Sequence, residues 1–169
     1  MEKSRTIRQA PDERSFHIFY QLLNGTLPEQ RSEFLLEDCK NYRFLTHGGV
    51  NVPGIDEAAE FKNTVNAMEI MGLNNEELSA IFRVISAVML FGNMQFKQER
   101  NADQATLPDD TVAQRVSHLL GLSVSDMTKA FLRPKLKVGR EFVTKAQTKE
   151  QVESSVEAIA KACYERMFK

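Results

Sequence analysis

The chain has 169 residues, a length that suits one domain with a single hydrophobic core. Hydrophobic residues make up 42% and charged residues 27% of it, which is ordinary for a globular protein and too apolar for a disordered tail. The formal net charge of -1 excludes the overall basic balance that is typical of nucleic-acid and membrane-surface binders, so any electrostatic function must be local.

A helix is predicted in the first 25 residues. Pro11 and Asp12 open it, its apolar residues recur at helical spacing, and Asn24 with Gly25 closes it. The following stretch, residues 38 to 54, predicts an extended, irregular connection because it mixes glycines with scattered apolar residues. Those residues are Tyr42, Phe44, Val50 and Val52.

Two further helices are predicted, one from Asp56 to Gly72 and one from Asn74 to Gly92. Asp56 is a good N-cap residue, and Gly72 is the residue type that ends a helix in the left-handed conformation. Asn74 with Glu77 has the spacing of a capping box. Apolar residues cover nearly the whole circumference of the second of these helices, which predicts a buried, central position.

The second half of the chain predicts an exposed polar loop over residues 97 to 110, followed by two shorter helices. The first of them ends at Gly121, and Ser123 caps the second. A last helix is predicted from Val152 to Met167 by the spacing of its apolar residues. The pattern continues to the last residues without a stop signal, which we interpret as a chain truncated in a helix.

Residues 135 to 144 interrupt the helical pattern. Lys135 and Lys137 alternate there with Leu136 and Val138, and a glycine opens the turn sequence that follows. This pattern predicts a short hairpin with a glycine-first turn, whose lysines point outward while its apolar face anchors it. The predicted fold is therefore mainly α with one small β-hairpin.

Basic residues crowd into this hairpin and its flanks: Arg133, Lys135, Lys137, Arg140 and Lys145. Only Glu141 opposes them, which leaves a local net charge of +4. The cluster suits an acidic protein surface, and a solvated basic loop without a partner is the alternative. Nucleic acid is less favoured because only Phe131 and Phe142 are near enough for stacking, and both are expected to face inward.

No catalytic constellation is predicted. The three histidines lack metal-ligand spacing, and neither a GxxxxGKS/T phosphate-binding loop nor a GxSxG motif occurs. The cysteines, Cys39 and Cys163, form no CxxC pair or disulfide framework, which is typical of a reducing, intracellular compartment. An enzyme that uses Cys39 beside Lys40 stays open as one reading. We predict no catalytic, metal or cofactor site.

Several motifs in the same order resemble the motor domain of myosin II, and the resemblance covers essentially the whole chain. They are Arg5-Thr-Ile-Arg-Gln9, Asp12-Glu-Arg-Ser-Phe-His-Ile-Phe-Tyr-Gln-Leu-Leu23, Met89-Leu-Phe-Gly-Asn93 and Lys137-Val-Gly-Arg140. Two others resemble the non-muscle and smooth-muscle branch more than the sarcomeric one. These are Glu99-Arg-Asn-Ala-Asp-Gln-Ala105 and Thr111-Val-Ala-Gln-Arg115.

The resemblance implies that residues 1 to 169 are a partial motor domain from the upper 50-kDa, actin-binding region, truncated at both ends. The basic segment then corresponds to the family's cardiomyopathy loop, which contacts actin through Arg133, Pro134, Lys135, Lys137, Val138, Arg140, Glu141 and Lys145. Glu141 takes the position where relatives carry an acidic or phosphorylatable residue. Lys135 departs from the family, which commonly has arginine after the proline. A second actin-facing loop would use Lys97, Glu99, Arg100 and Asp103.

The function implied is a segment of an actin-based, ATP-driven cytoskeletal motor that contacts filaments and couples them to the nucleotide site. Partners would be actin filaments and the remainder of the motor, with light chains and a coiled-coil dimer only through the parent protein. No nucleic-acid or membrane partner is expected. ATP and Mg would belong to the parent motor, so this segment is expected to be inactive alone. The alternative is a free-standing helical interaction module without ATPase activity.

Overall fold

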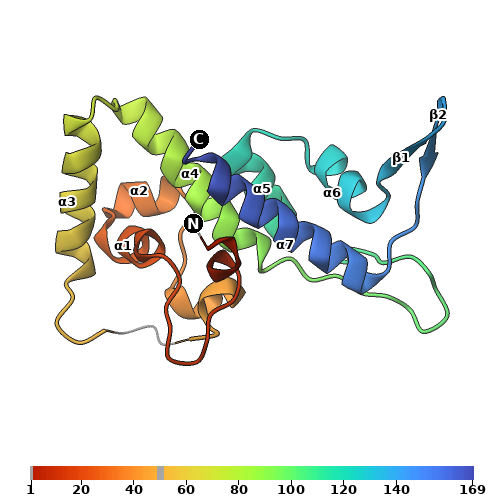
Figure 1. The fold of residues 1–169 in the computed structure, drawn as a ribbon, viewed down its shortest axis with the longest axis horizontal. Coiled ribbons are helices and arrows are strands. Elements are labelled where there is room, and N and C mark those ends of the chain that lie inside the picture. The colour runs from red at the N-terminus through yellow and green to blue at the C-terminus, as the bar shows by residue number, and fades with distance from the viewer. Residues whose placement is uncertain (1, 49–51) are drawn as a thin grey trace.

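Helices dominate the computed structural model of the chain, which describes residues 2 to 48 and 52 to 169 (Figure 1). The α-helices in this part are α1 (His17–Gly25), α2 (Pro28–Glu33), α3 (Glu57–Ile70), α4 (Asn75–Phe91), α5 (Thr111–Leu120), α6 (Val124–Leu132) and α7 (Lys149–Arg166). Short 3-10 helices are η1 (Lys3–Thr6), η2 (Cys39–Asn41) and η3 (Arg43–Leu45). Strands β1 (Lys135–Val138) and β2 (Glu141–Thr144) form an antiparallel hairpin. The predicted mainly α fold with one small hairpin is confirmed.

Helix ends lie where capping residues predicted them in the middle of the chain. The Asp56 carboxylate accepts hydrogen bonds from two backbone N–H groups of the first turn of α3. Asn74 and Glu77 form the predicted capping box at the start of α4, with hydrogen bonds of 2.9 to 3.0 Å. Gly72 and Gly121, with φ of 98° and 66°, adopt the left-handed conformation that ends α3 and α5.

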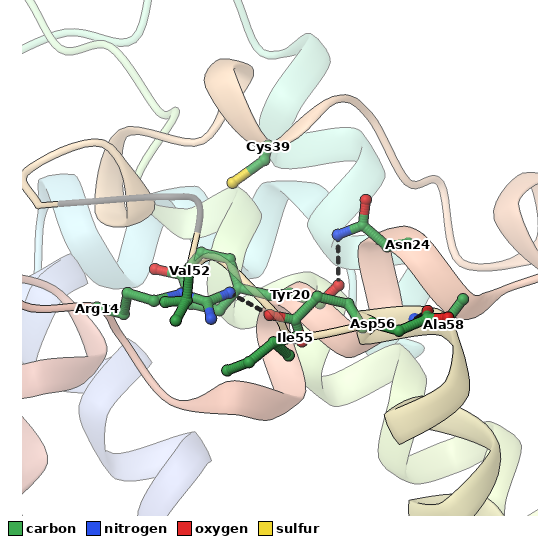
Figure 2. A pocket seen from close by; sticks show the side chains of 9 residues that line it. Arg14, Tyr20, Asn24, Cys39, Val52, Ile55, Asp56 and Ala58 are labelled. Carbon is green, nitrogen blue, oxygen red and sulfur yellow. Dashed lines mark hydrogen bonds and ion pairs between the residues drawn. The ribbon is translucent and has the colours of Figure 1, made fainter.

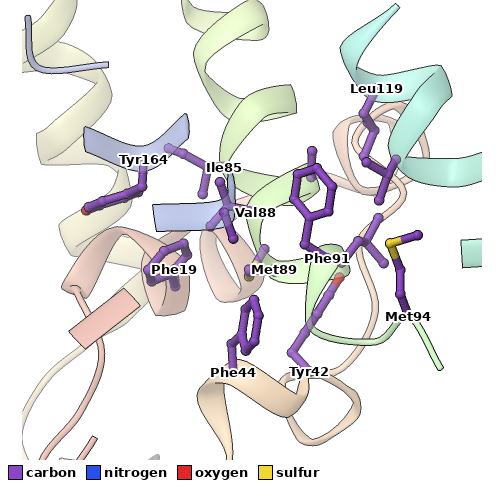
Figure 3. Close-up of a cluster of buried hydrophobic side chains, with 14 of the residues drawn as sticks. Phe19, Tyr42, Phe44, Ile85, Val88, Met89, Phe91, Met94, Leu119 and Tyr164 are labelled. Atoms are coloured by element: carbon purple, nitrogen blue, oxygen red, sulfur yellow. The ribbon is translucent and has the colours of Figure 1, made fainter. Parts of the chain in front are cut away.

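The helix α4 is central, as its apolar circumference predicts. It packs against α1, α5 and α7, and Ala87, Val88 and Leu90 are at most 1% exposed. Figure 3 shows side chains from several elements converging on it, Phe19 and Tyr164 on one side and Leu119 and Met94 on the other. Each such large apolar side chain stabilises the fold by roughly 2 kcal/mol through its burial.

The first helix starts later than the sequence predicts. α1 begins at His17, and the segment before it is an irregular loop that binds to η1. The hydroxyl of Ser15 donates to the carbonyl of Arg5 at 2.9 Å, and the Ser15 N–H donates to the Tyr20 hydroxyl at 3.0 Å. These hydrogen bonds fix the loop in an irregular conformation, where the sequence predicted a helical turn. The short helix α2 was not predicted at all; Pro28 occupies its first turn.

The prediction of an extended connection over residues 38 to 54 is wrong for its first part. Residues 39 to 45 form η2 and η3, and Tyr42, Phe44 and Leu45 are buried in the core. The Phe44 ring lies under α4 so closely that a Cβ at Gly92 would meet it at 2.7 Å. Val50, from the same prediction, lies outside the described residues.

The last helix holds the N-terminal segment in place. The carboxylate of Glu157 on α7 accepts from both Arg8 and Arg43, at 3.2 and 3.4 Å. The Tyr164 ring stacks on Phe16 with 4.9 Å between the ring centroids. Segments from both ends of the chain therefore contribute to one core.

Candidate functional site

The hairpin has the geometry that its sequence predicts. Lys135 pairs with Thr144, Leu136 with Val143, Lys137 with Phe142 and Val138 with Glu141. Gly139 has a φ of 63°, whereas Arg140 has a negative φ, which is the combination of a glycine-first, two-residue turn. The hairpin projects from one end of the helical body, at the right of Figure 1.

The five basic side chains of this segment are free of local partners. Arg133, Lys135, Lys137, Arg140 and Lys145 are all exposed. None of them takes part in an ion pair with any residue that the structure describes. The positive charge predicted from the sequence is therefore presented to solvent, where an acidic surface can approach it.

The apolar face of the hairpin does not anchor it, and this prediction is wrong. Leu136, Val138 and Val143 share one face and are 46%, 62% and 51% exposed. The other face carries the lysines together with Phe142, which is 69% exposed and does not face inward. The reason is that the hairpin extends beyond the helices, so none of the described helices covers either face (Figure 1). Phe131, by contrast, is buried as predicted.

The loop over residues 97 to 110 is exposed at the positions predicted to face a partner. Lys97, Glu99, Arg100 and Asp103 all have exposed side chains. An isolated bridge joins Lys97 to Thr106 and closes the loop at its base. Ala105 is 2% exposed, however, so the base of the loop packs into the body of the protein.

Hydrogen bonds join this loop to the two ends of the hairpin. The Gln104 side-chain amide donates to the carbonyl of Leu132 at 2.9 Å, and the Ala105 N–H donates to the carbonyl of Gln147 at 2.8 Å. The Lys149 N–H donates to the Gln98 side-chain oxygen at 2.7 Å. The structure thus brings the two predicted contact segments together. Sequence reasoning missed both glutamines, because nothing distinguishes them from other polar loop residues.

Comparison with known proteins agrees with the motif resemblance. The family model for the myosin head (motor domain) matches residues 1 to 169. The chain belongs to this family. It is also 69% identical over its whole length to a Drosophila melanogaster protein described as "Myosin heavy chain, non-muscle". The chain spans 8% of the length of that relative. The predicted resemblance to a myosin motor domain is confirmed.

Two common signatures of nucleotide and metal sites were sought in this part of the myosin head. The phosphate-binding loop motif is absent from its sequence, and the described residues hold no cluster of three or more His, Cys, Asp or Glu side chains that fits a metal ion. No helix among those residues is long and apolar enough to cross a membrane.

A polar pocket lies beside Cys39, the residue that an enzyme with a cysteine nucleophile would use. Figure 2 shows Arg14, Tyr20 and Asn24 around it, and no histidine lines it. Burial raises the pKa of the Cys39 thiol, and the nearby Arg14 charge opposes that rise only in part. Burial also raises the pKa of Cys163. Both thiols are therefore held in the protonated, weakly nucleophilic form at neutral pH, which disfavours the enzyme reading.

Proposed function

We propose that residues 1 to 169 form part of the upper 50-kDa, actin-binding region of an ATP-driven cytoskeletal motor, and that the basic hairpin contacts the actin filament. The observation that carries this proposal is the projecting hairpin with five exposed cations and no ion pair to a described residue. Membership of the myosin head family supports the choice of actin as the partner. The place of action would be the actin cytoskeleton of the cytoplasm.

The residues proposed to meet the filament extend over two segments. Charged residues of the hairpin supply long-range attraction, and Val138 with its exposed neighbours supplies apolar area that becomes buried on contact. The loop residues Lys97, Glu99, Arg100 and Asp103 form a second, mixed-charge contact. Binding through such exposed charges is expected to be weak and sensitive to salt.

The ATP and Mg of the proposed motor would be held by other parts of the parent protein, as would the light chains and the coiled-coil dimer. The contribution of this chain would be mechanical. Short connections, residues 133 to 134 and 145 to 148, join the hairpin to the end of α6 and the start of α7. Helix α7 runs back through the body to contact η1 (Figure 1). We propose that this continuous helix couples filament contact to the nucleotide site.

Filament pelleting tests the proposal. The chain is sedimented with filamentous actin at low salt, alongside a Lys135→Glu, Lys137→Glu variant and a Lys40→Glu, Lys62→Glu control that changes the net charge equally. We expect the wild type and the control to pellet alike, and the hairpin variant to bind about tenfold more weakly, since opposite charges steer and strengthen such contacts. Equal pelleting of the hairpin variant and the wild type would show that the hairpin lysines do not contribute to filament binding.

A second candidate function is the free-standing helical interaction module. The observation in its favour is the hydrophobic core, in which buried residues between Ile7 and Tyr164 form one cluster. That version requires the chain to fold cooperatively alone. A thermal melt without a sharp transition would count against it.

A further inference from the structure

We propose that Gln104 is a positioning residue, which joins the loop of residues 97 to 106 to the hairpin so that they form one bipartite surface. The inference rests on the proposed filament contact for its biological meaning. Its physical content is independent of any partner. It concerns how the two segments are held relative to each other.

The Gln104 amide satisfies a backbone group at the end of α6. Leu132 is the last residue of that helix, and the final carbonyls of a helix have no partner within it. The Gln104 side-chain nitrogen donates to this carbonyl at 2.9 Å and to the carbonyl of Ala105 at 2.8 Å. The first strand of the hairpin starts at Lys135, after only two intervening residues, so Gln104 holds the base of the hairpin.

The other root of the hairpin is held by the same loop. Lys149 is the first residue of α7, and its N–H is one of the donors that lack a partner at a helix start. The Gln98 side-chain oxygen accepts from it at 2.7 Å. The Ala105 N–H adds a hydrogen bond of 2.8 Å to the carbonyl of Gln147, just before the helix. The loop therefore bridges both helix ends from which the hairpin springs.

This arrangement fixes the direction of the hairpin relative to the loop. The two segments then lose little further conformational freedom when a partner binds both of them. This lower entropy cost strengthens binding without any direct contact from Gln104. Without the Gln104 hydrogen bond the hairpin would keep its charges, but its orientation relative to the loop would vary more widely. Any loss of affinity would then come from this orientation and not from a change of charge.

One substitution made at three glutamines separates position from charge. Gln104→Glu removes the amide donor and places a carboxylate against two carbonyl oxygens. Gln98→Glu keeps an acceptor for the Lys149 N–H, although it loses the 2.7 Å bond that Gln98 donates to Ala102 within the loop. Gln95→Glu, at an exposed position outside the loop, adds the same charge and serves as the control.

Amide hydrogen exchange of the chain in the absence of actin is the deciding measurement. We expect Gln104→Glu to speed exchange about tenfold at Ala105 and at Lys145, whose N–H donates to the Pro134 carbonyl between the hairpin legs, since local opening follows lost hydrogen bonds. Gln98→Glu and Gln95→Glu should leave these two amides unchanged. Val88 in the core reports global stability. If its exchange also rises, Gln104→Ala, which adds no charge, takes the place of Gln104→Glu.

Unchanged exchange at Ala105 and Lys145 in the Gln104 variants would overturn the positioning role. Pelleting with actin then tests the proposed function separately. We expect about threefold weaker binding for Gln104→Glu and wild-type binding for the Gln98 and Gln95 variants, because looser orientation adds an ordering cost. If the wild-type chain does not pellet with actin, the proposed filament contact is wrong. The hydrogen-exchange result would still decide whether Gln104 positions the hairpin.

Discussion

Arg14 and Glu57 form an ion pair of 2.5 Å that ties the loop before α1 to the first turn of α3. Their side chains are only 13% and 14% exposed, and the Arg14 guanidinium lies 3.9 Å from the centroid of the Tyr20 ring. Figure 2 shows Arg14 and Tyr20 in the pocket beside Cys39, which Glu57 also lines. Arg14 Nε and Glu57 Oε2 have no hydrogen-bond partner among the described residues.

Breaking this pair from one side should destabilise the fold more than replacing both partners. We expect Arg14→Met alone or Glu57→Leu alone to lower the free energy of unfolding by about 2 to 4 kcal/mol, because each leaves a largely buried charge without a partner. The double replacement should cost less than either single one. Urea unfolding of the four proteins measures the difference, and additive losses would contradict it.

Tyr164 should make the fold sensitive to alkaline pH. Burial raises its pKa from 10.0 to about 12, so the folded state keeps the phenol proton that the unfolded state loses. The stabilisation is complete below pH 10 and is lost as the pH rises from 10 to 12. Each pKa unit corresponds to about 1.4 kcal/mol, which makes the contribution of this shift about 3 kcal/mol.

The variant Tyr164→Phe should lack the loss of unfolding free energy that Tyr164 causes between pH 10 and pH 12. Urea unfolding at several pH values between 9 and 12 compares it with the wild type, so that contributions from lysines, common to both proteins, cancel. Burial raises the pKa of Tyr42 to about 12 as well. Tyr42 is less suited to this comparison, because its hydroxyl accepts a hydrogen bond of 2.8 Å from the Glu37 N–H, which a phenylalanine would lose. Parallel pH profiles for the wild type and Tyr164→Phe would refute the effect.

Two phenylalanines close in sequence should respond differently to the same truncation. Phe131 is 7% exposed and meets Phe91 edge-on with ring centroids 6.1 Å apart. We expect Phe131→Ala to cost about 3 to 4 kcal/mol. Phe142→Ala, at a 69% exposed position, should change stability by less than about 0.5 kcal/mol. Chemical unfolding checks both, and a large cost at Phe142 would mean that the hairpin packs against the body.

The contact between α1 and α3 should not tolerate a side chain at Gly25. A Cβ there would collide with the Cβ of Phe61 and meet its Cγ at 2.6 Å. Phe61 is itself 4% exposed and cannot move outward. We expect Gly25→Ala to lower the free energy of unfolding by about 1 to 3 kcal/mol through overpacking. A melting temperature equal to that of the wild type would show that the helices are less closely packed.

The sequence predicts best what local chemistry decides. The capping residues Asp56 and Asn74 and the terminating Gly121 act within one helical turn, so the ends of their helices could be read directly. The hairpin turn at Gly139 is local in the same sense. The cations of the hairpin could be predicted as an exposed cluster because charged side chains without partners stay in water.

The failures concern contacts between distant residues. Tyr42 and Phe44 looked like an irregular connection because their burial depends on residues far along the chain, such as the end of α4 above the Phe44 ring. The exposure of Val138 and Phe142 could not be predicted, since alternation shows that two faces differ but not whether anything covers either. Gln104 gave no signal, because its partner is a backbone carbonyl that any sequence would offer.

The carboxylate of Glu157 lies 149 residues after Arg8, which it binds. A ribosome that makes this protein releases the N-terminal segment long before α7 exists. Arg8 and Arg43 therefore lack this carboxylate partner until α7 has been made. The ion pairs that fix Arg8 and η3 against α7 are therefore among the late contacts of this part of the myosin head, because they wait for a helix far along the chain.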